Sequence, residues 1–166
     1  MGWKTVTLND AYPVVSKGKP PKYVAQSNVF VLNQACVHWD KIAFENVKYQ
    51  DEVAAVKVFD LFDGDILLNS TGTGTLGRCN IFVPENNDVR YIADSHLTVL
   101  RGSKVLSNVF FKYFMKFGGI QARLYAECVA GSTNQVDIVK EKLLRFKLFL
   151  PSLALQNRFA DFVQAT

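Results

Sequence analysis

The sequence has few of the residues that build metal sites and disulfide frameworks. It contains 3 cysteines, Cys36, Cys79 and Cys128, and 2 histidines, and no two cysteines form a Cys-x-x-Cys pair. An odd number of widely spaced cysteines indicates neither a disulfide framework nor a zinc site. We therefore expect three buried thiols, and no metal or other cofactor.

Long hydrophobic runs are also absent. No apolar stretch approaches the roughly 18 residues that a membrane-spanning helix needs, and residues 1–6 lack the basic-then-apolar order of a signal peptide. The length of 166 residues and the hydrophobic share of 49% suit one packed domain. These features predict a cytoplasmic globular protein with no membrane partner.

Acidic residues are missing from one long segment. Residues 95–126 contain five basic side chains and no acid, whereas residues 40–65 contain seven acids and three lysines. This asymmetry predicts one face suited to phosphates and another turned away from them. Ordinary solvated lysines on a helix would give the same pattern, so both interpretations remain open.

Apolar periodicity and turn residues indicate a β-rich middle followed by helices, and hence an α+β fold. Ser107 is placed to cap a helix that runs to Phe117 and ends at the following Gly-Gly pair, and Ser152 to cap a final helix with Leu155, Phe159 and Phe162 on one face. The Gly and Pro residues of segment 15–22 predict a loop without regular structure. The predicted strands span residues 3–8, 29–34, 42–49, 66–68, 79–83, 97–100 and 146–150.

A glycine-rich segment satisfies a cofactor-binding pattern. Gly72, Gly74 and Gly77 have the G-x-G-x-x-G spacing of dinucleotide-binding loops and follow a predicted strand. Such a loop must lead into a helix whose N-terminus meets the pyrophosphate, but residues 79–84 are β-branched, aromatic and stopped by proline. A small nucleotide-dependent oxidoreductase is therefore the enzyme alternative, and it requires a helix after Gly77.

The same segment is rich in side chains that can donate hydrogen bonds. Its glycines permit close backbone approach, and its hydroxyl, amide and guanidinium groups could contact phosphate oxygens or base edges. The alternative is a solvated hairpin connection whose glycines serve only the turn. The polar members are Asn69, Ser70, Thr71, Thr73, Thr75 and Arg78.

Support for catalysis is weak. His38 and His96 stand apart from any nucleophile pattern, and are expected to be satisfied or surface histidines. The paired carboxylates lie in turn or loop segments, where acids are common. The sequence contains no adenine-methylase tetrapeptide of the Asn-Pro-Pro-Tyr kind and no nuclease carboxylate-lysine cluster. We predict a chain without catalytic residues.

Five segments, in order, resemble one known family. They are Leu32–Val37 (LNQACV), Gly64–Arg78 (GDILLNSTGTGTLGR), Asp94–Arg101 (DSHLTVLR), Gly131–Gln135 (GSTNQ) and Leu148–Gln156 (LFLPSLALQ). Together they are similar to the specificity subunit of type I restriction-modification enzymes, and the similarity extends from Trp3 to the end of the chain. The Gly-Asp-Ile-Leu start, the Gly-Arg close of the loop and the final Leu-Pro-x-Leu-x-x-Gln are its most specific parts.

The resemblance implies a DNA target-recognition domain in residues 1–150, with a twisted, mostly antiparallel sheet and a few short helices. Residues 151–166 would begin a conserved helix that pairs with a second such helix. The implied partners are double-stranded DNA, a methyltransferase subunit that uses S-adenosylmethionine, and a restriction subunit that translocates and cuts DNA. A complete subunit carries two recognition domains, so this chain would be a fragment, or a half-subunit that self-associates through its C-terminal helix.

On this interpretation the chain docks through phosphate contacts and reads one half of a bipartite target. The basic residues expected to face DNA are Lys17, Lys19, Lys22, Arg78, Arg101 and Lys104. The expected base-edge or sugar contacts are Ser70, Thr71, Thr73, Asn134 and Gln135. Two alternatives remain open: that residues 131–135 only anchor the last strand and helix, and that the chain is a protein-interaction module that uses its terminal apolar helix.

Overall fold

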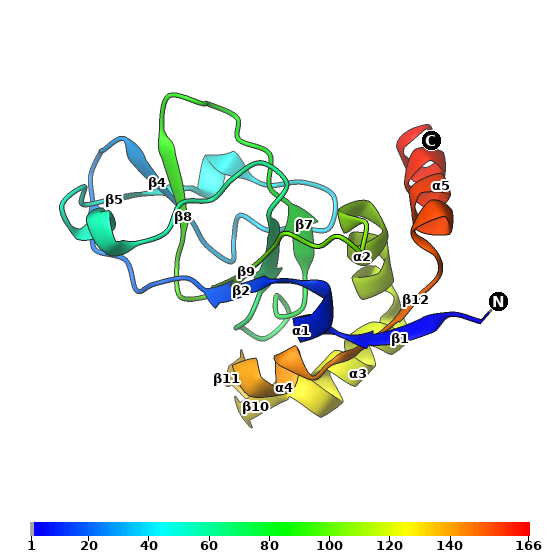
Figure 1. Ribbon diagram of the computed structural model, residues 1–166. Coiled ribbons are helices and arrows are strands. Elements are labelled where there is room, and N and C mark those ends of the chain that lie inside the picture. Colours follow the sequence, from blue (N-terminus) through cyan, green and yellow to red (C-terminus); the bar gives the residue numbers. More distant parts are fainter. Residues whose placement is uncertain (1) are drawn as a thin grey trace.

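The computed structural model describes residues 2–166. Short strands dominate its first two-thirds, and most of its helices follow (Figure 1). The elements are β1 (Lys4–Thr7), α1 (Leu8–Ala11), β2 (Val14–Lys17), β3 (Tyr23–Val24), β4 (Val29–Leu32), η1 (Phe44–Asn46), β5 (Lys48–Gln50), η2 (Ala54–Lys57), β6 (Ile66–Asn69), β7 (Cys79–Ile81), β8 (Arg90–Ala93), β9 (Leu97–Arg101), α2 (Asn108–Lys116), α3 (Gly118–Cys128), β10 (Val129–Ser132), β11 (Gln135–Ile138), α4 (Lys140–Leu144), β12 (Lys147–Leu150) and α5 (Leu153–Gln164).

The central sheet has the strand order β2-β9-β6-β7, and all its pairs are antiparallel. Every residue of β6 is buried, which explains the apolar run Ile66–Leu68 that precedes the buried Asn69 at its end. Successive side chains of a strand point to opposite faces, so Ile66 and Leu68 enter one hydrophobic cluster while Leu67 enters another. The sheet is therefore covered on both faces.

A second sheet, β3-β5-β4-β8, lies toward the Leu67 side of the first (Figure 1). Its strands β4 and β8 are parallel, whereas its other pairs are antiparallel. Phe82 and Tyr91 pack edge to face between the sheets, with ring centroids 5.2 Å apart. The predicted α+β class with mostly antiparallel strands is confirmed, with this one parallel pair as the exception.

The opposite face of the central sheet is covered by helices. Phe111 and Met115 of α2 and Leu124 of α3 are fully buried in the cluster that contains Ile66 and Leu68. The Ser107 side chain accepts a hydrogen bond from the third backbone N–H of α2, as a helix N-cap does. Ser152 caps α5 in the same way. Both helix starts were predicted correctly.

Two expectations about the first fifty residues were wrong. Segment 15–22 was expected to lack regular structure, but β2 extends to Lys17 because Val14 and Val15 pair with the end of β9. Only after Gly18 does the chain leave the sheet. The strand expected over residues 42–49 is mostly absent, because a 3-10 turn occupies Phe44–Asn46 and β5 begins at Lys48.

The Gly-Gly pair after Phe117 does not end the helical region. The backbone of Phe117 is extended, and a new helix, α3, starts at Gly118. It forms because Ile120, Leu124 and Cys128 recur at helical spacing and are all buried. The strand β8 and the short helix α4 were also absent from the predicted elements.

The terminal helix α5 turns only part of its predicted apolar stripe toward the rest of the molecule. Leu155 and Phe162 are 50% and 70% exposed, whereas Gln156 and Ala160 are buried. Of the predicted stripe, Phe159 makes the inward contact, because its ring packs edge to face on Phe110 at 5.8 Å. Both termini lie on this side of the molecule (Figure 1).

Candidate nucleic-acid interface

The glycine-rich loop, residues 69–78, joins β6 to β7. Gly72, Gly74 and Gly77 have φ angles of +91°, +83° and +88°, a region that glycine enters without a steric penalty. The glycine spacing therefore serves the path of the loop. A strand, Cys79–Ile81, follows the last glycine, so the helix that a dinucleotide site requires is missing and the oxidoreductase alternative is removed.

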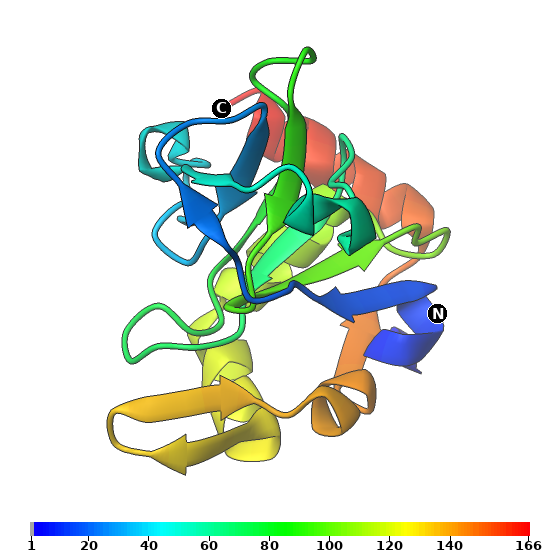
Figure 2. The ribbon, with the colours of Figure 1, turned by 90° about the vertical axis from the view of Figure 1, so that its left-hand side faces the viewer.

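The loop is held against the hairpin formed by β10 and β11. The backbone N–H of Gly72 donates to Val136 O at 3.3 Å, and that of Ile138 donates to Ser70 O at 2.8 Å. The Thr73 hydroxyl donates to the carbonyl of Thr133, next to the hairpin tip, at 3.1 Å. Loop and hairpin project from the same side of the molecule (Figure 2), and we call them, together with the β8–β9 turn at residues 94–96, the loop face.

Lys17, at the end of β2, also belongs to this face. Its Nζ lies 2.6 Å from Oδ2 of Asp137 in β11, and both side chains are partly exposed. Lys19 is exposed two residues later, and its side chain has no carboxylate within 4 Å among residues 2–166. Lys22 is also exposed and lies 3.2 Å from Asp51. Exposed ion pairs of this kind are weak and exchange readily with other anions.

The hydroxyls of the loop are mostly engaged inside the protein. Ser70 is 1% exposed, and its Oγ shares a hydrogen bond with the Thr98 hydroxyl. Thr71 Oγ1 contacts Gln34 and His96. Ser70 and Thr71 therefore support the loop in this conformation, whereas Thr73 is exposed and contacts the hairpin. A role for any of them in contacting bases stays a prediction.

Residues 131–135 form the tip of the hairpin. They were expected either to contact DNA or to anchor the last strand and helix. The chain turns between Ser132 and Gln135, which pair across the hairpin. Asn134 and Gln135 are exposed there, so both amides are available to a ligand. The carbonyl of Thr133 within this segment accepts from Thr73, and further contacts come from Asp137 and Ile138 of β11.

Arg78 closes the loop on the side facing α2 and α3. Its guanidinium donates to the carbonyl of Gly74 at 2.8 Å. An open cleft of about 550 Å³ lies beside it, and Lys116, Trp39 and Tyr125 also line this cleft. Two cationic and two aromatic side chains thus flank the loop here. Stacking on aromatic rings and ionic contact with phosphates are the usual means of binding nucleic acids.

Arg101 does not join the loop face. Its guanidinium forms two hydrogen bonds of 2.7 Å with the buried carboxylate of Asp65 and lies over the rings of Phe59 and Phe62. Hydrogen bonding to this carboxylate raises the pKa of Arg101 above its ordinary value. The guanidinium is occupied by these contacts, which the sequence could not indicate because Asp65 lies far away in the chain.

Lys104 also lies apart from the loop face. It lines a cleft of about 470 Å³ with Trp3, Leu150 and Leu155, close to the start of α5. The structure therefore divides the predicted contact set. Lys17, Thr71, Thr73 and the tip of the hairpin come together, whereas Arg101 and Lys104 lie elsewhere. The DNA role of each remains untested.

The loop face includes two residues that were not among the predicted contacts. Gln34 and His96 both contact Thr71 Oγ1, at 3.0 and 2.7 Å. His96 was expected to be a satisfied or surface residue, and it is both exposed and hydrogen-bonded. No motif links it to the loop. His96 lies in the turn between β8 and β9, and β9 pairs with β6, the strand that leads into the loop. This position is the signal that could have linked His96 to the loop.

The three cysteines lie inside the protein. Cys36, Cys79 and Cys128 are buried, as expected, and burial raises their thiol pKa values to about 11, about 12 and about 11. Thiols of this kind are unreactive at neutral pH. Within residues 2–166, no group of three His, Cys, Asp or Glu side chains could hold a metal ion. The same residues include no helix long and apolar enough to cross a membrane.

Two solved structures that share this fold are described as specificity subunits of type I restriction-modification systems. The S subunit from M. genitalium matches 99% of this chain with a TM-score of 0.66 and 16% identity. The HsdS subunit from Thermoanaerobacter tengcongensis matches 99% with a TM-score of 0.69 and 18% identity. The chain has the fold of a type I specificity-subunit segment. The resemblance carried by the five ordered sequence segments is thus confirmed at the level of the fold.

A third match, with a TM-score of 0.70 and 16% identity over 99% of this chain, comes from a structure described as the basis of complex assembly and conformational transition of the type I restriction-modification system. The chain spans 39%, 37% and 38% of the three matched chains. No family model and no curated protein matches the sequence. The shared fold therefore covers 99% of this chain, but this chain corresponds to less than half of each matched chain.

Proposed function

We propose that this chain is a DNA target-recognition module of a type I restriction-modification system. It reads one half of a bipartite target and carries no catalytic chemistry of its own. The observation that supports this most strongly is the fold match over 99% of the chain to specificity subunits. The loop face supports it independently, because it combines cationic side chains with exposed amides.

DNA binding on this face would divide its contacts into two kinds. Lys17, Lys19 and Lys22 follow one another along a single segment and would position the phosphate backbone. Asn134 and Gln135, exposed at the hairpin tip, would approach base edges. Asn and Gln can form paired hydrogen bonds with adenine in the major groove. Arg78 and Lys116, on the other flank of the loop, would extend the phosphate contact.

The proposed partners are a methyltransferase subunit and a restriction subunit, which would supply methylation and cleavage. Residues 1–150 would form the recognition domain, and residues 151–166 the start of a longer spacer helix through which two copies could associate. Leu155 and Phe162, exposed on α5, suit such a helix pairing. The proposed location is the cytoplasm, where bacterial DNA lies.

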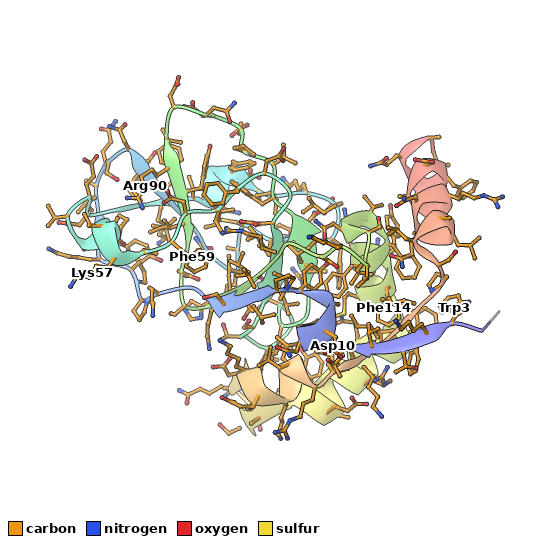
Figure 3. All side chains as sticks on the ribbon, viewed as in Figure 1. Trp3, Asp10, Lys57, Phe59, Arg90 and Phe114 are labelled. Carbon is orange, nitrogen blue, oxygen red and sulfur yellow. The ribbon has the colours of Figure 1, made fainter. Side chains whose placement is uncertain are left out.

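A second candidate is a protein-interaction module that works through the helical end of the molecule alone, by which we mean Trp3, Phe117 and the exposed face of α5. It is favoured by the apolar side chains exposed there, Trp3 at 61% and Phe117 at 69% among them. Trp3 and Phe114 line the same cleft of about 380 Å³ (Figure 3). In this case the lysines of the loop face would serve only solubility.

A salt titration of duplex binding separates the two candidates. Each phosphate neutralised adds about 0.9 to the slope of log K against log salt. A DNA-binding chain should therefore weaken steeply as salt rises, and a Lys17→Gln, Lys19→Gln, Lys22→Gln triple variant should lose up to about 3 from the slope. The matched control replaces Lys140, Lys142 and Lys147, which lie on and after α4. Absence of salt-dependent binding to any duplex, with or without the methyltransferase subunit, would contradict the proposal.

A further inference from the structure

The strongest unexplained feature of the loop face is a chain of hydrogen bonds that ends at an exposed histidine. Thr71 Oγ1 donates to Gln34 Oε1 at 3.0 Å and lies 2.7 Å from His96 Nδ1. The backbone N–H of His96 donates to Oδ1 of the buried Asp94 at 2.9 Å. The imidazole is thus held through Nδ1 and the backbone of the same residue through Asp94, although the residue is exposed.

Counting protons along this chain determines the tautomer of His96. The Thr71 hydroxyl has one proton, and the carboxamide oxygen of Gln34 can only accept a hydrogen bond. The hydroxyl proton is therefore used toward Gln34, and the proton between Thr71 and His96 must come from Nδ1. Neutral His96 then carries its proton on Nδ1 and a lone pair on Nε2. Among residues 2–166, Nε2 of His96 has no hydrogen-bond partner.

The position of this lone pair is set by rigid elements. The carbonyl of His96 accepts from Ser70 N at 2.8 Å, so the turn is tied to the glycine-rich loop. Thr71 is paired through a β-bridge with Asp137, the partner of Lys17. Loop, turn and hairpin meet at this point. An acceptor held by packed neighbours can discriminate between ligands, because it does not reorient to suit the wrong one.

We propose that Nε2 of His96 is a specificity-determining acceptor for a base that carries an exocyclic amino group, adenine or cytosine, in the major groove. This inference rests on the proposed function. Adenine N6 and cytosine N4 present donors in the major groove, whereas the guanine O6 and N7 atoms and thymine O4 present acceptors. A fixed lone pair accepts from the first two bases and repels the second two.

The tautomer can be tested without DNA. Long-range ¹H–¹⁵N correlation spectra of the ¹⁵N-labelled chain distinguish the two neutral tautomers, and the chain has 2 histidines. His38 is an internal reference, because its Nε2 lies 3.0 Å from the Ala35 carbonyl and must donate to it. We expect opposite tautomers for the two residues, with a His38→Gln variant for assignment. Finding the proton of His96 on Nε2, as a reversed Gln34 amide would place it, overturns the inference.

The DNA arm compares the wild-type chain with His96→Ala and Thr71→Val in selection from a random duplex library, with the methyltransferase subunit present and absent. We expect each variant to lose roughly two- to tenfold of the preference for adenine or cytosine at one position, the effect of one hydrogen bond. Preferences elsewhere and the salt slope should persist. Thr71→Val keeps the branched shape but removes the hydroxyl. The proton of neutral His96 should then no longer be restricted to Nδ1.

The outcomes distinguish the two proposals. A wild-type motif that is unchanged in both variants contradicts the reading role of His96 and leaves the proposed function intact. A preference at the affected position for guanine or thymine also contradicts the inference. A wild-type chain that selects no motif in either condition contradicts the proposed function, and the reading role of His96 fails with it. Melting curves of both variants establish that they remain folded.

Discussion

The loop face and the helical end of this molecule differ in how they treat exposed side chains. On the loop face, exposed or half-exposed polar groups such as Thr71, Thr73 and His96 are held by internal hydrogen bonds. At the helical end, Trp3, Phe117 and Phe162 are more than half exposed. A fixed polar surface suits selection among chemically similar ligands, whereas an open apolar surface suits burial against a partner.

The largest effect is expected at Arg101, at the end of β9 on the face that carries Leu97 and Val99, where the guanidinium is paired with a buried acid. Arg101→Met would leave the carboxylate of Asp65, which is 2% exposed, without its cation. We expect the free energy of unfolding to fall by about 3 kcal/mol, because an unpaired buried charge remains. Urea denaturation followed by circular dichroism measures this change.

Arg78→Met is the matched control on the loop face. Its guanidinium donates only to the Gly74 carbonyl among residues 2–166, so the free energy of unfolding should change by less than about 1 kcal/mol. Equal decreases in the free energy of unfolding for the two variants would show that Arg78 supports the fold as much as Arg101 does.

A somewhat smaller effect is expected within α5. Gln156 is 1% exposed; its Oε1 accepts from Ser107 N at 2.8 Å, and its amide nitrogen donates to Val105 O and Pro151 O. Gln156→Leu should lower the free energy of unfolding by about 2 kcal/mol, because buried backbone groups lose their partners. Thermal unfolding compares it with Phe162→Ala, which should change the free energy by less than about 0.5 kcal/mol. A larger loss for Phe162→Ala would show that the exposed side of the helix is already packed.

The smallest expected difference lies in the glycine-rich loop. Gly74→Ala and Gly77→Ala both place a side chain at a positive φ, which costs roughly 1–2 kcal/mol. A Cβ at Gly74 meets nothing within 4 Å, whereas one at Gly77 would lie 2.3 Å from Gln121 Oε1. We expect Gly77→Ala to be about 1 kcal/mol more destabilising in chemical denaturation. Equal values would mean that Gln121 moves freely.

Local patterns predicted the elements that local contacts create. Ser107 and Ser152 predicted the starts of their helices because a capping hydroxyl acts within three residues. The apolar run Ile66–Leu68 predicted β6, because a strand that is covered on both faces has few polar residues. The start of α3 at Gly118 was missed, because a Gly-Gly pair usually ends a helix and only the burial of Ile120 and Leu124 overrides it.

The candidate site was less predictable, because its contacts join distant segments. Arg101 was predicted to contact DNA, but its guanidinium is paired with Asp65, which lies 36 residues earlier in the sequence. His96 looked isolated, although Thr71 lies 25 residues before it in the sequence and 2.7 Å away in space. The strand after the glycine-rich loop was predicted correctly, since that prediction needed only the local sequence of residues 79–84.

On the proposed function, the loop face binds DNA and selects a sequence. Selection of duplexes from a random library, with the methyltransferase subunit present and absent, is the decisive experiment. We expect enrichment of one short motif, corresponding to half of a bipartite target, in at least the condition with the partner, and loss of that enrichment when Lys17, Lys19 and Lys22 are replaced together. Recovery of random sequence in both conditions would show that the chain does not read DNA.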